Sequence, residues 1–177
     1  MKRFHLFPSV FLLGIFAASA SLQAQQAVIT QNYGTHRLGV GANYWVSLSD
    51  IDVDDVDDNG FSYLISYQYW KNLVGFEADV EFLPDRFGES AWAPEAYILF
   101  GEGIYVAAGI GWINEDGDWQ DKPFYALRMG FDFELFASFY LDLSANYRFN
   151  DTADLKNSDT KVDTDTIFLG ASLRYAF

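Results

Sequence analysis

Apolar and polar residues alternate at every second position along most of the chain. A period of two is typical of β-strands, because successive side chains of a strand point to opposite faces. The end of the chain is the plainest case, with six apolar side chains on one face: Ile167, Leu169, Ala171, Leu173, Tyr175 and Phe177. The pattern predicts eight strands, at residues 38–48, 61–70, 74–82, 92–100, 104–113, 125–135, 139–150 and 166–177.

The connections between these segments alternate in length. Four are long, at residues 50–60, 84–90, 114–122 and 151–165, and three have only three residues, at 71–73, 101–103 and 136–138. Long loops on one side and tight turns on the other are typical of a transmembrane barrel, whose strands need about 9–11 residues to cross a bilayer. Pro94 has no N–H to donate to a sheet ladder, so it is predicted at the rim of its strand.

The two faces of the predicted strands differ in chemistry. One face carries Leu, Val, Ile, Phe and Tyr, whereas the other carries mostly Gly, Ala, Ser and charged residues. A soluble barrel directs its apolar face inward around a ligand, but the lumen of eight strands is narrow and filled by side chains. The bulky face is therefore predicted to point outward. The sequence predicts an all-β protein, an eight-stranded antiparallel up-and-down transmembrane β-barrel.

The inward face then holds charged residues, for which we predict a lumenal ion-pair network. Counting from the short-turn ends places Arg174, Asp142, Asp132 and Glu77 in one layer, and Arg128, Glu81, Glu95 and Arg148 in a second. The complete predicted set is Arg37, Glu77, Asp79, Glu81, Glu95, Arg128, Asp132, Glu134, Asp142, Arg148 and Arg174.

Residues 1–24 have the features of a secretory signal peptide. Lys2 and Arg3 precede an apolar stretch, and small residues follow, so cleavage is predicted after Ala20 or Ala24, with Ala24 favoured. Residues 25–177 then form a single barrel domain with nine basic and 25 acidic residues. A net charge of −16 argues against nucleic-acid partners.

The chain resembles the small outer-membrane β-barrel proteins in its strand and loop pattern and in its last nine residues, Leu-Gly-Ala-Ser-Leu-Arg-Tyr-Ala-Phe. This family includes the OmpA transmembrane domain, OmpX and Ail. The resemblance implies an outer-membrane location with extracellular long loops, both termini in the periplasm and a monomeric state. It implies contact with outer-membrane lipid and lipopolysaccharide, and recognition of Leu173, Tyr175 and Phe177 by the outer-membrane assembly machinery.

The implied roles are adhesion, serum resistance or envelope integrity, without enzymatic activity. A narrow porin-like channel is the first alternative, and an outer-membrane lipid-modifying enzyme is the second. The chain has no cysteine, and His36 is the only histidine after the predicted signal, so no nucleophile–base pair is recognisable.

The connection 50–60 carries six aspartates and no basic residue. Its Asp55, Asp57 and Asn59 match the first half of a calcium loop, but the twelfth position is Ser66 instead of a bidentate Glu. No cofactor is therefore expected, and calcium at this connection stays an alternative to a solvated acidic loop.

The loop pattern generates a prediction about orientation. An epitope inserted at Asp55, Gly117 or Asn157 is expected to be accessible to antibody on whole cells. An epitope at Asn72 or at residues 101–103 is expected to be detected only after the outer membrane is broken. Antibody labelling measures both, and the reverse pattern would contradict the predicted orientation.

Overall fold

The computed structural model describes residues 34–48, 58–86, 88–115, 117–154 and 161–177. The predicted signal peptide, both predicted cleavage positions and the aspartates at 55 and 57 lie outside these residues. None of the described residues forms a helix that is long and apolar enough to cross a bilayer. The regular structure of this part of the chain is β-sheet throughout.

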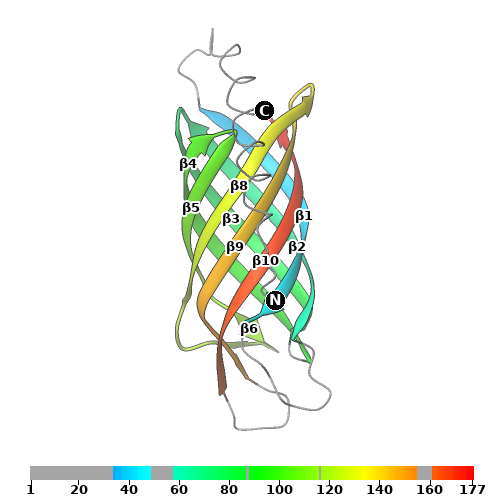
Figure 1. The fold of residues 1–177 in the computed structure, drawn as a ribbon, viewed down its shortest axis with the longest axis vertical. Helices are drawn as coiled ribbons and strands as arrows, with labels where there is room; N and C mark the ends of the chain where they lie inside the picture. The colour runs from blue at the N-terminus through cyan, green and yellow to red at the C-terminus, as the bar shows by residue number, and fades with distance from the viewer. Residues whose placement is uncertain (1–33, 49–57, 87, 116, 155–160) are drawn as a thin grey trace, which may run out of the picture. The chain divides into compact units, whose positions relative to one another are not determined.

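Eight long strands and one small hairpin make up the described part of the chain (Figure 1). The hairpin consists of β6 (Asn114–Glu115) and β7 (Asp118–Trp119) and lies between β5 and β8 in the sequence. Each long strand contains most or all of one predicted segment, so the predicted strand count is confirmed. The long strands are β1 (Thr35–Ser47), β2 (Asn59–Lys71), β3 (Val74–Arg86), β4 (Glu89–Glu102), β5 (Ile104–Gly111), β8 (Phe124–Phe136), β9 (Phe139–Asp154) and β10 (Lys161–Ala176).

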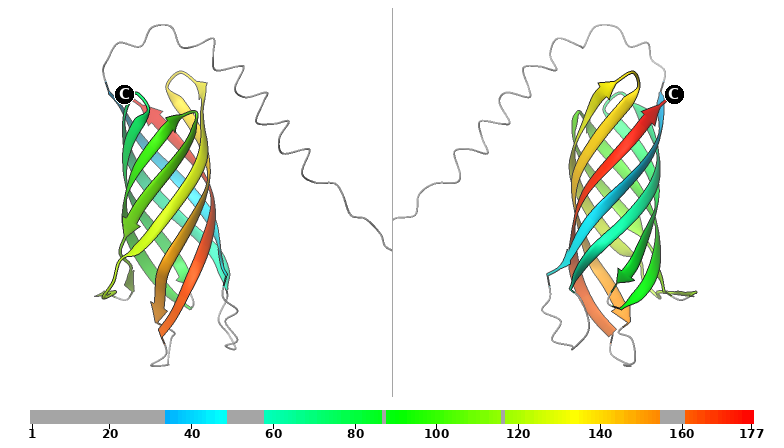
Figure 2. Two further views of the ribbon diagram at one scale, coloured as in Figure 1. Left: turned by 60° about the vertical axis from the view of Figure 1, so that its left-hand side comes forward. Right: turned by 90° about the vertical axis from the view of Figure 1, so that its right-hand side faces the viewer.

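The sheet closes on itself as an antiparallel barrel. Consecutive long strands pair with each other, and the first strand pairs with the last, with Val40 of β1 opposite Leu173 of β10. Figure 2 shows the tilted strands around the ring from two sides. Closure leaves no unpaired edge among the long strands, which is how up-and-down barrels avoid edge-to-edge association.

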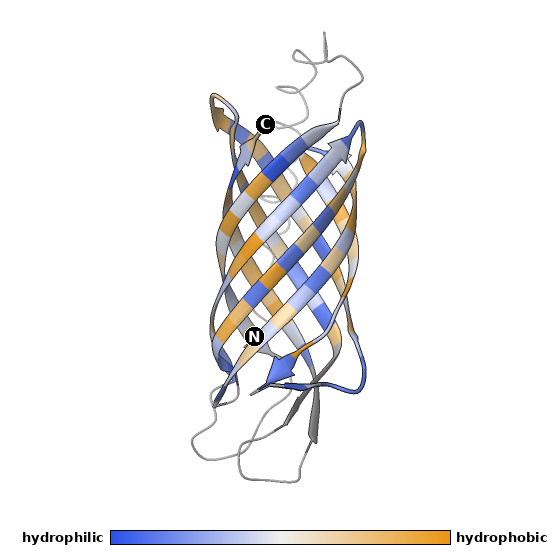
Figure 3. Cartoon of the chain, turned by 180° about the vertical axis from the view of Figure 1, so that it is seen from behind, coloured by the Kyte–Doolittle hydropathy of each residue, from blue (hydrophilic) through white to orange (hydrophobic). Residues whose placement is uncertain are grey.

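Side chains alternate between the outside and the lumen as the sequence predicts. In β2, Ile65 exposes 66% of its surface, whereas its neighbour Ser66 exposes 1%. The same alternation runs around the ring, and Figure 3 shows it as alternating hydrophobic and hydrophilic blocks along the strands. The bulky face is thus outside and the smaller, polar face inside, which confirms the predicted direction of the two faces.

Two connections that were predicted to be long are largely strand. β3 continues to Arg86 and β4 begins at Glu89, and these two residues pair, so little remains of the predicted loop 84–90. Likewise, β9 continues to Asp154 and β10 begins at Lys161, so both strands extend into the predicted loop 151–165. Apolar and polar residues alternate only where a strand separates apolar from polar surroundings. Backbone hydrogen bonds can continue a hairpin beyond that region, so the sequence pattern does not predict these strand ends.

Pro94 is inside β4 instead of at its rim. It lies opposite Val80 of β3, and its carbonyl accepts a hydrogen bond of 3.2 Å from the N–H of Trp112. Its missing N–H faces the interruption between β5, which ends at Gly111, and β6, which continues the same register. The rim prediction was wrong because proline is also tolerated where a ladder is already interrupted.

The short turns, at residues 72–73, 103 and 137–138, lie at the same end of the barrel as the C-terminus (Figure 1). The N–H of Ala176 donates to the carbonyl of Ser138, in the turn between β8 and β9, at 2.8 Å. Near the end of β4, Gly101 has a φ of 141°, and an added Cβ would lie 2.2 Å from the carbonyl oxygen of Ile104. Only glycine fits that position without a backbone shift.

The barrel's closure generates a prediction about Phe177. Its N–H donates to the carbonyl of His36 at 2.9 Å, and its ring is 60% exposed in line with Leu173 and Tyr175. Deleting Phe177 removes this link and the terminal aromatic, so the folded, heat-modifiable fraction on gels is expected to fall sharply. Phe136→Ala, which truncates an exposed ring at the same end, is the control. Equal assembly of both variants would contradict an assembly role for the terminal residue.

Candidate functional site

The lumen begins, at the end with the short turns, with an ion pair between β1 and β8. The Arg37 guanidinium pairs with the carboxylate of Asp132, and these side chains are only 11% and 8% exposed. Arg37 also lies over the ring of Tyr140, with 3.9 Å between its guanidinium carbon and the ring centroid. The pair therefore narrows this mouth of the barrel.

Glu77 of β3 is the centre of the next cluster. Arg128 of β8 donates to it through Nη1 at 2.5 Å, and Nη2 of Arg174 lies 3.3 Å from its second oxygen. Arg128 also reaches Asp79 at 3.1 Å, and Arg174 lies 3.8 Å from Asp142. Two arginines thus join three carboxyl groups from β3 and β9, all buried.

Arg148 of β9 organises the cluster above. Its guanidinium bridges Glu81 of β3 and Glu95 of β4, and all three side chains are at most 2% exposed. The hydroxyl of Tyr97 donates to Glu95 and accepts a bond of 2.9 Å from Asn146. Two further donors, Asn43 and Ser62, satisfy the other oxygen of Glu81.

An apolar cluster fills the lumen towards the loop-bearing end. Arg148 joins it to the polar layers, because its guanidinium lies 3.9 Å from the ring centroid of Phe168 and 4.7 Å from that of Phe124. Beyond the cluster, Arg86 of β3 pairs with Glu115 of β6 at 2.5 Å, which ties the small hairpin to the β3–β4 turn. The members of the cluster are Trp45, Leu83, Ala91, Ala93, Ile113, Phe124 and Phe168.

The structure assigns the ion pairs differently from the sequence. Asp132 pairs with Arg37 instead of Arg174, and Arg128 pairs with Glu77 and Asp79 instead of Glu81 and Glu95. Counting residues from the strand ends neglects the tilt and stagger of a barrel, which place equal counts at different heights. Ten of the eleven predicted residues take part in these clusters.

Glu134, the eleventh predicted residue, does not enter the lumen. Its side chain is exposed and accepts a hydrogen bond of 3.2 Å from the N–H of Ser138 in the turn between β8 and β9. Glu134 pairs with Tyr140 in the same register as Asp132 with Asp142, so it keeps the parity of Asp132. It lies two residues nearer the turn than Asp132, and there its side chain is exposed and bonds to the turn instead of to a lumenal partner.

The polar partners of the charged groups and the apolar cluster were missed by the sequence analysis. Tyr97, Asn43 and Phe168 share the inward parity of their strands with the charged residues, so the period of two gives their direction. The period does not predict which residues these side chains contact, because the contacts join strands that are far apart in the sequence, such as β1 and β3.

The remaining predicted residues lie outside the lumen. Leu173, Tyr175 and Phe177 are exposed on the outward face at the short-turn end. His36 also lies there, with Nδ1 2.6 Å from the Tyr67 hydroxyl and its ring stacked on that of Phe177. Of the calcium candidates, only Asn59 is described; its amide oxygen accepts a hydrogen bond of 3.0 Å from Tyr44.

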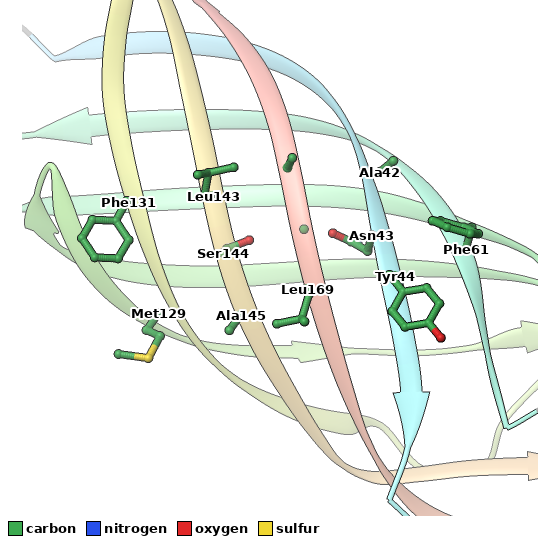
Figure 4. Close-up of a pocket in the computed structure, with 12 residues that line it drawn as sticks. Ala42, Asn43, Tyr44, Phe61, Met129, Phe131, Leu143, Ser144, Ala145 and Leu169 are labelled. Carbon is green, nitrogen blue, oxygen red and sulfur yellow. The ribbon is translucent and has the colours of Figure 1, made fainter. Parts of the chain in front are cut away.

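The outer wall is hollowed over β1, β9 and β10, as Figure 4 shows. Small side chains, Ala42, Ala145 and Ala171, form the floor of a groove of about 510 Å³. Larger apolar side chains stand around it: Tyr44, Phe61, Met129, Phe131, Leu143 and Leu169. The groove is open to the outside and forms part of the apolar belt of the barrel.

The bridging geometry of Arg148 generates a prediction about stability. Arg148→Met leaves Glu81 and Glu95 buried without their cation, so the free energy of unfolding is expected to fall by about 3–5 kcal/mol. Adding Glu81→Gln removes one stranded charge and keeps an acceptor for Asn43 and Ser62. The double variant is therefore expected to be more stable than Arg148→Met alone in urea titrations of refolded protein. Equal stability would show that stranded charge is not the cause.

Solved structures of three other proteins share this fold, whereas no family model and no curated protein sequence matches the chain. Neisserial surface protein A has a TM-score of 0.59 and 16% identity, over 82% of this chain and all of that protein. Outer membrane protein AlkL has a TM-score of 0.51 and 15% identity, over 84% of this chain and 92% of that one. Outer membrane protein OprG from Pseudomonas aeruginosa has a TM-score of 0.50 and 14% identity, over 82% and 97%. The chain has the fold of the small eight-stranded outer-membrane β-barrels.

Proposed function

We propose that this protein is a non-enzymatic integral protein of the bacterial outer membrane that acts through its loop-bearing end. The observation that carries the proposal is the filled lumen. Ion pairs occupy it from Arg37 to Arg148, and the apolar cluster around Phe168 follows them. The described side chains that occupy the lumen favour a barrel without an open passage for solutes, so we propose that its contacts with partners are made on its outer surfaces.

The apolar belt supports the membrane location. Large apolar side chains on every long strand are exposed, for example Val40, Ile65, Phe100 and Leu169, each by more than half. Exposed apolar surface of this extent around a whole barrel matches the hydrocarbon core of a bilayer and is unlike a soluble monomer. We propose that outer-membrane lipid and lipopolysaccharide cover it, with acyl chains in the groove over Ala42 and Ala171.

The orientation follows from the two ends. We propose that the short turns and both termini face the periplasm, where Leu173, Tyr175 and Phe177 are recognised by the assembly machinery. The opposite end would then be extracellular. The four connections predicted there carry 17 acidic and four basic residues in the sequence. Among the described residues, Asp58, Asp85, Asp118 and Asp121 are exposed there.

An acidic extracellular end favours partners with basic surfaces, because complementary charge accelerates and orients association. This supports adhesion or serum resistance, whereas a lipid-covered, rigid barrel supports a role in envelope integrity. The name of the neisserial protein with the same fold describes a surface protein, which agrees with display on the cell surface. We propose a monomer, because a closed ring leaves no strand edge to share with a second copy.

The closed lumen generates a prediction about conductance. Refolded, heat-modifiable protein in planar bilayers is expected to give no conductance steps, with a large porin as the positive control. Stepwise conductance would contradict the proposal and favour the narrow channel. The enzyme alternative has its own measurement: lipid A masses from cells with and without the protein are expected to be identical, and a new lipid A species would identify a lipid-modifying activity.

A further inference from the structure

Two pairs of carboxyl side chains face each other directly across neighbouring strands inside the lumen. Asp79 of β3 lies opposite Glu95 of β4, and Asp132 of β8 lies opposite Asp142 of β9. Directly opposite residues have Cβ atoms about 4.5–5.5 Å apart, and like charges in such positions destabilise a sheet. The four side chains are at most 8% exposed, so water screens their repulsion poorly.

The charges in this part of the lumen do not balance. Between the short-turn end and the apolar cluster, the described lumenal side chains include six carboxyl and four guanidinium groups. Fully ionised, they would have a net charge of −2, and an unpaired buried charge costs several kcal/mol. The carboxyl groups are Glu77, Asp79, Glu81, Glu95, Asp132 and Asp142, and the guanidinium groups are Arg37, Arg128, Arg148 and Arg174.

The hydrogen bonds identify the least stabilised carboxylate of each pair. The Tyr105 hydroxyl faces Asp142, but no hydrogen bond of ordinary geometry reaches either oxygen of this carboxyl group, and its ion-pair partner Arg174 is 3.8 Å away. Asp79 accepts from Arg128 through Oδ2 only, and its Oδ1 has no donor. Glu95 accepts from both Arg148 and Tyr97. Asp132 accepts from Arg37 through Oδ2, although its Oδ1 has no donor, so it has one hydrogen bond more than Asp142.

The surroundings of the two aspartates are mixed in charge. Asp79 is faced by Glu77 on its own strand, by Glu95 on β4 and by Arg128 on β8. Asp142 is faced by Asp132 and Arg128 on β8, Arg174 on β10, Glu77 on β3 and the Tyr105 hydroxyl on β5. Each aspartate therefore has at least as many acidic neighbours as arginine neighbours.

We propose that the lumen contains two proton-binding sites, one at Asp79–Glu95 and one at Asp132–Asp142. Each opposed pair holds one proton at neutral pH, with Asp79 and Asp142 as its sites. The two protons come from solvent when the barrel folds, and they make the lumen electrically neutral. Each protonated carboxyl can also donate a hydrogen bond to an oxygen of the opposed carboxylate, which removes the repulsion across the strands.

Proton linkage gives the proposal a quantitative test. Unfolded carboxyl groups are ionised well above pH 4, so the folded barrel binds two more protons than the unfolded chain. Its stability therefore falls as pH rises, and the unfolding equilibrium constant is expected to rise about 100-fold per pH unit near neutrality. Asp79→Asn or Asp142→Asn removes one site and is expected to reduce this to about tenfold per unit. The double variant is expected to show almost no dependence.

The measurement is urea unfolding of refolded barrels at several pH values, in sodium chloride and in choline chloride. Asp118→Asn, at an exposed position on β7, is the matched control and is expected to keep the wild-type slope. All other side chains are the same in every variant, so the comparison isolates the substituted carboxyl groups. A wild-type slope equal to that of the double variant would overturn the proposal. So would a stability that depends on sodium and is independent of pH, because sodium would then supply the neutralising charge.

Infrared spectroscopy gives a second readout that does not require unfolding. Folded wild-type protein at neutral pH is expected to show the carbonyl band of protonated carboxyl groups, reduced by about half in each single variant. If an aspartate variant fails to fold, the wild-type spectrum alone decides. Absence of the band would overturn the proposal. The conductance measurement in planar bilayers tests the proposed function separately, and neither of its outcomes changes this result.

Discussion

The structure depends on one constraint, which is that the hydrogen-bonding groups of every long strand are paired around a closed ring. Pairing of β1 with β10 completes that ring, and the backbone of Phe177 extends it to the last residue. A strand with unpaired N–H and C=O groups cannot lie in hydrocarbon, because each such group costs several kcal/mol there. Closure is therefore what makes the apolar outer face usable as a membrane surface.

Closure also limits what the interior can contain. Eight strands leave a narrow lumen, and two of its large aromatic side chains find room beside a glycine on the neighbouring strand. Gly109 lies under the ring of Tyr97, and Gly130 lies under that of Tyr105; a Cβ at either position would come within 2.6 Å of the ring. These glycines allow both aromatic rings to cross the lumen among the ion pairs. The interior is thus a packed core that contains both charged and apolar side chains.

The two halves of that core differ in their physical role. Around Glu77 and Glu81 the arginines need carboxylate partners from other strands, so the ion pairs tie β3 to β8, β9 and β10. Buried ion pairs add little net stability, but they disfavour any register that leaves a charge unpaired. Near the loop-bearing end the described lumenal side chains form an apolar cluster instead.

The sequence alone determined the strand count, the direction of the two faces and, apart from Glu134, which of the predicted charged residues enter the lumen. These follow from a period of two, which is a local property of each strand. It did not determine the partners, because Arg128 with Glu77 and Arg37 with Asp132 join residues more than 45 positions apart. Only the tilt and stagger of the closed ring decide which inward side chains lie at the same height. The tertiary structure likewise decided that Glu134 stays outside and that Trp45, Phe124 and Phe168 meet as one apolar cluster.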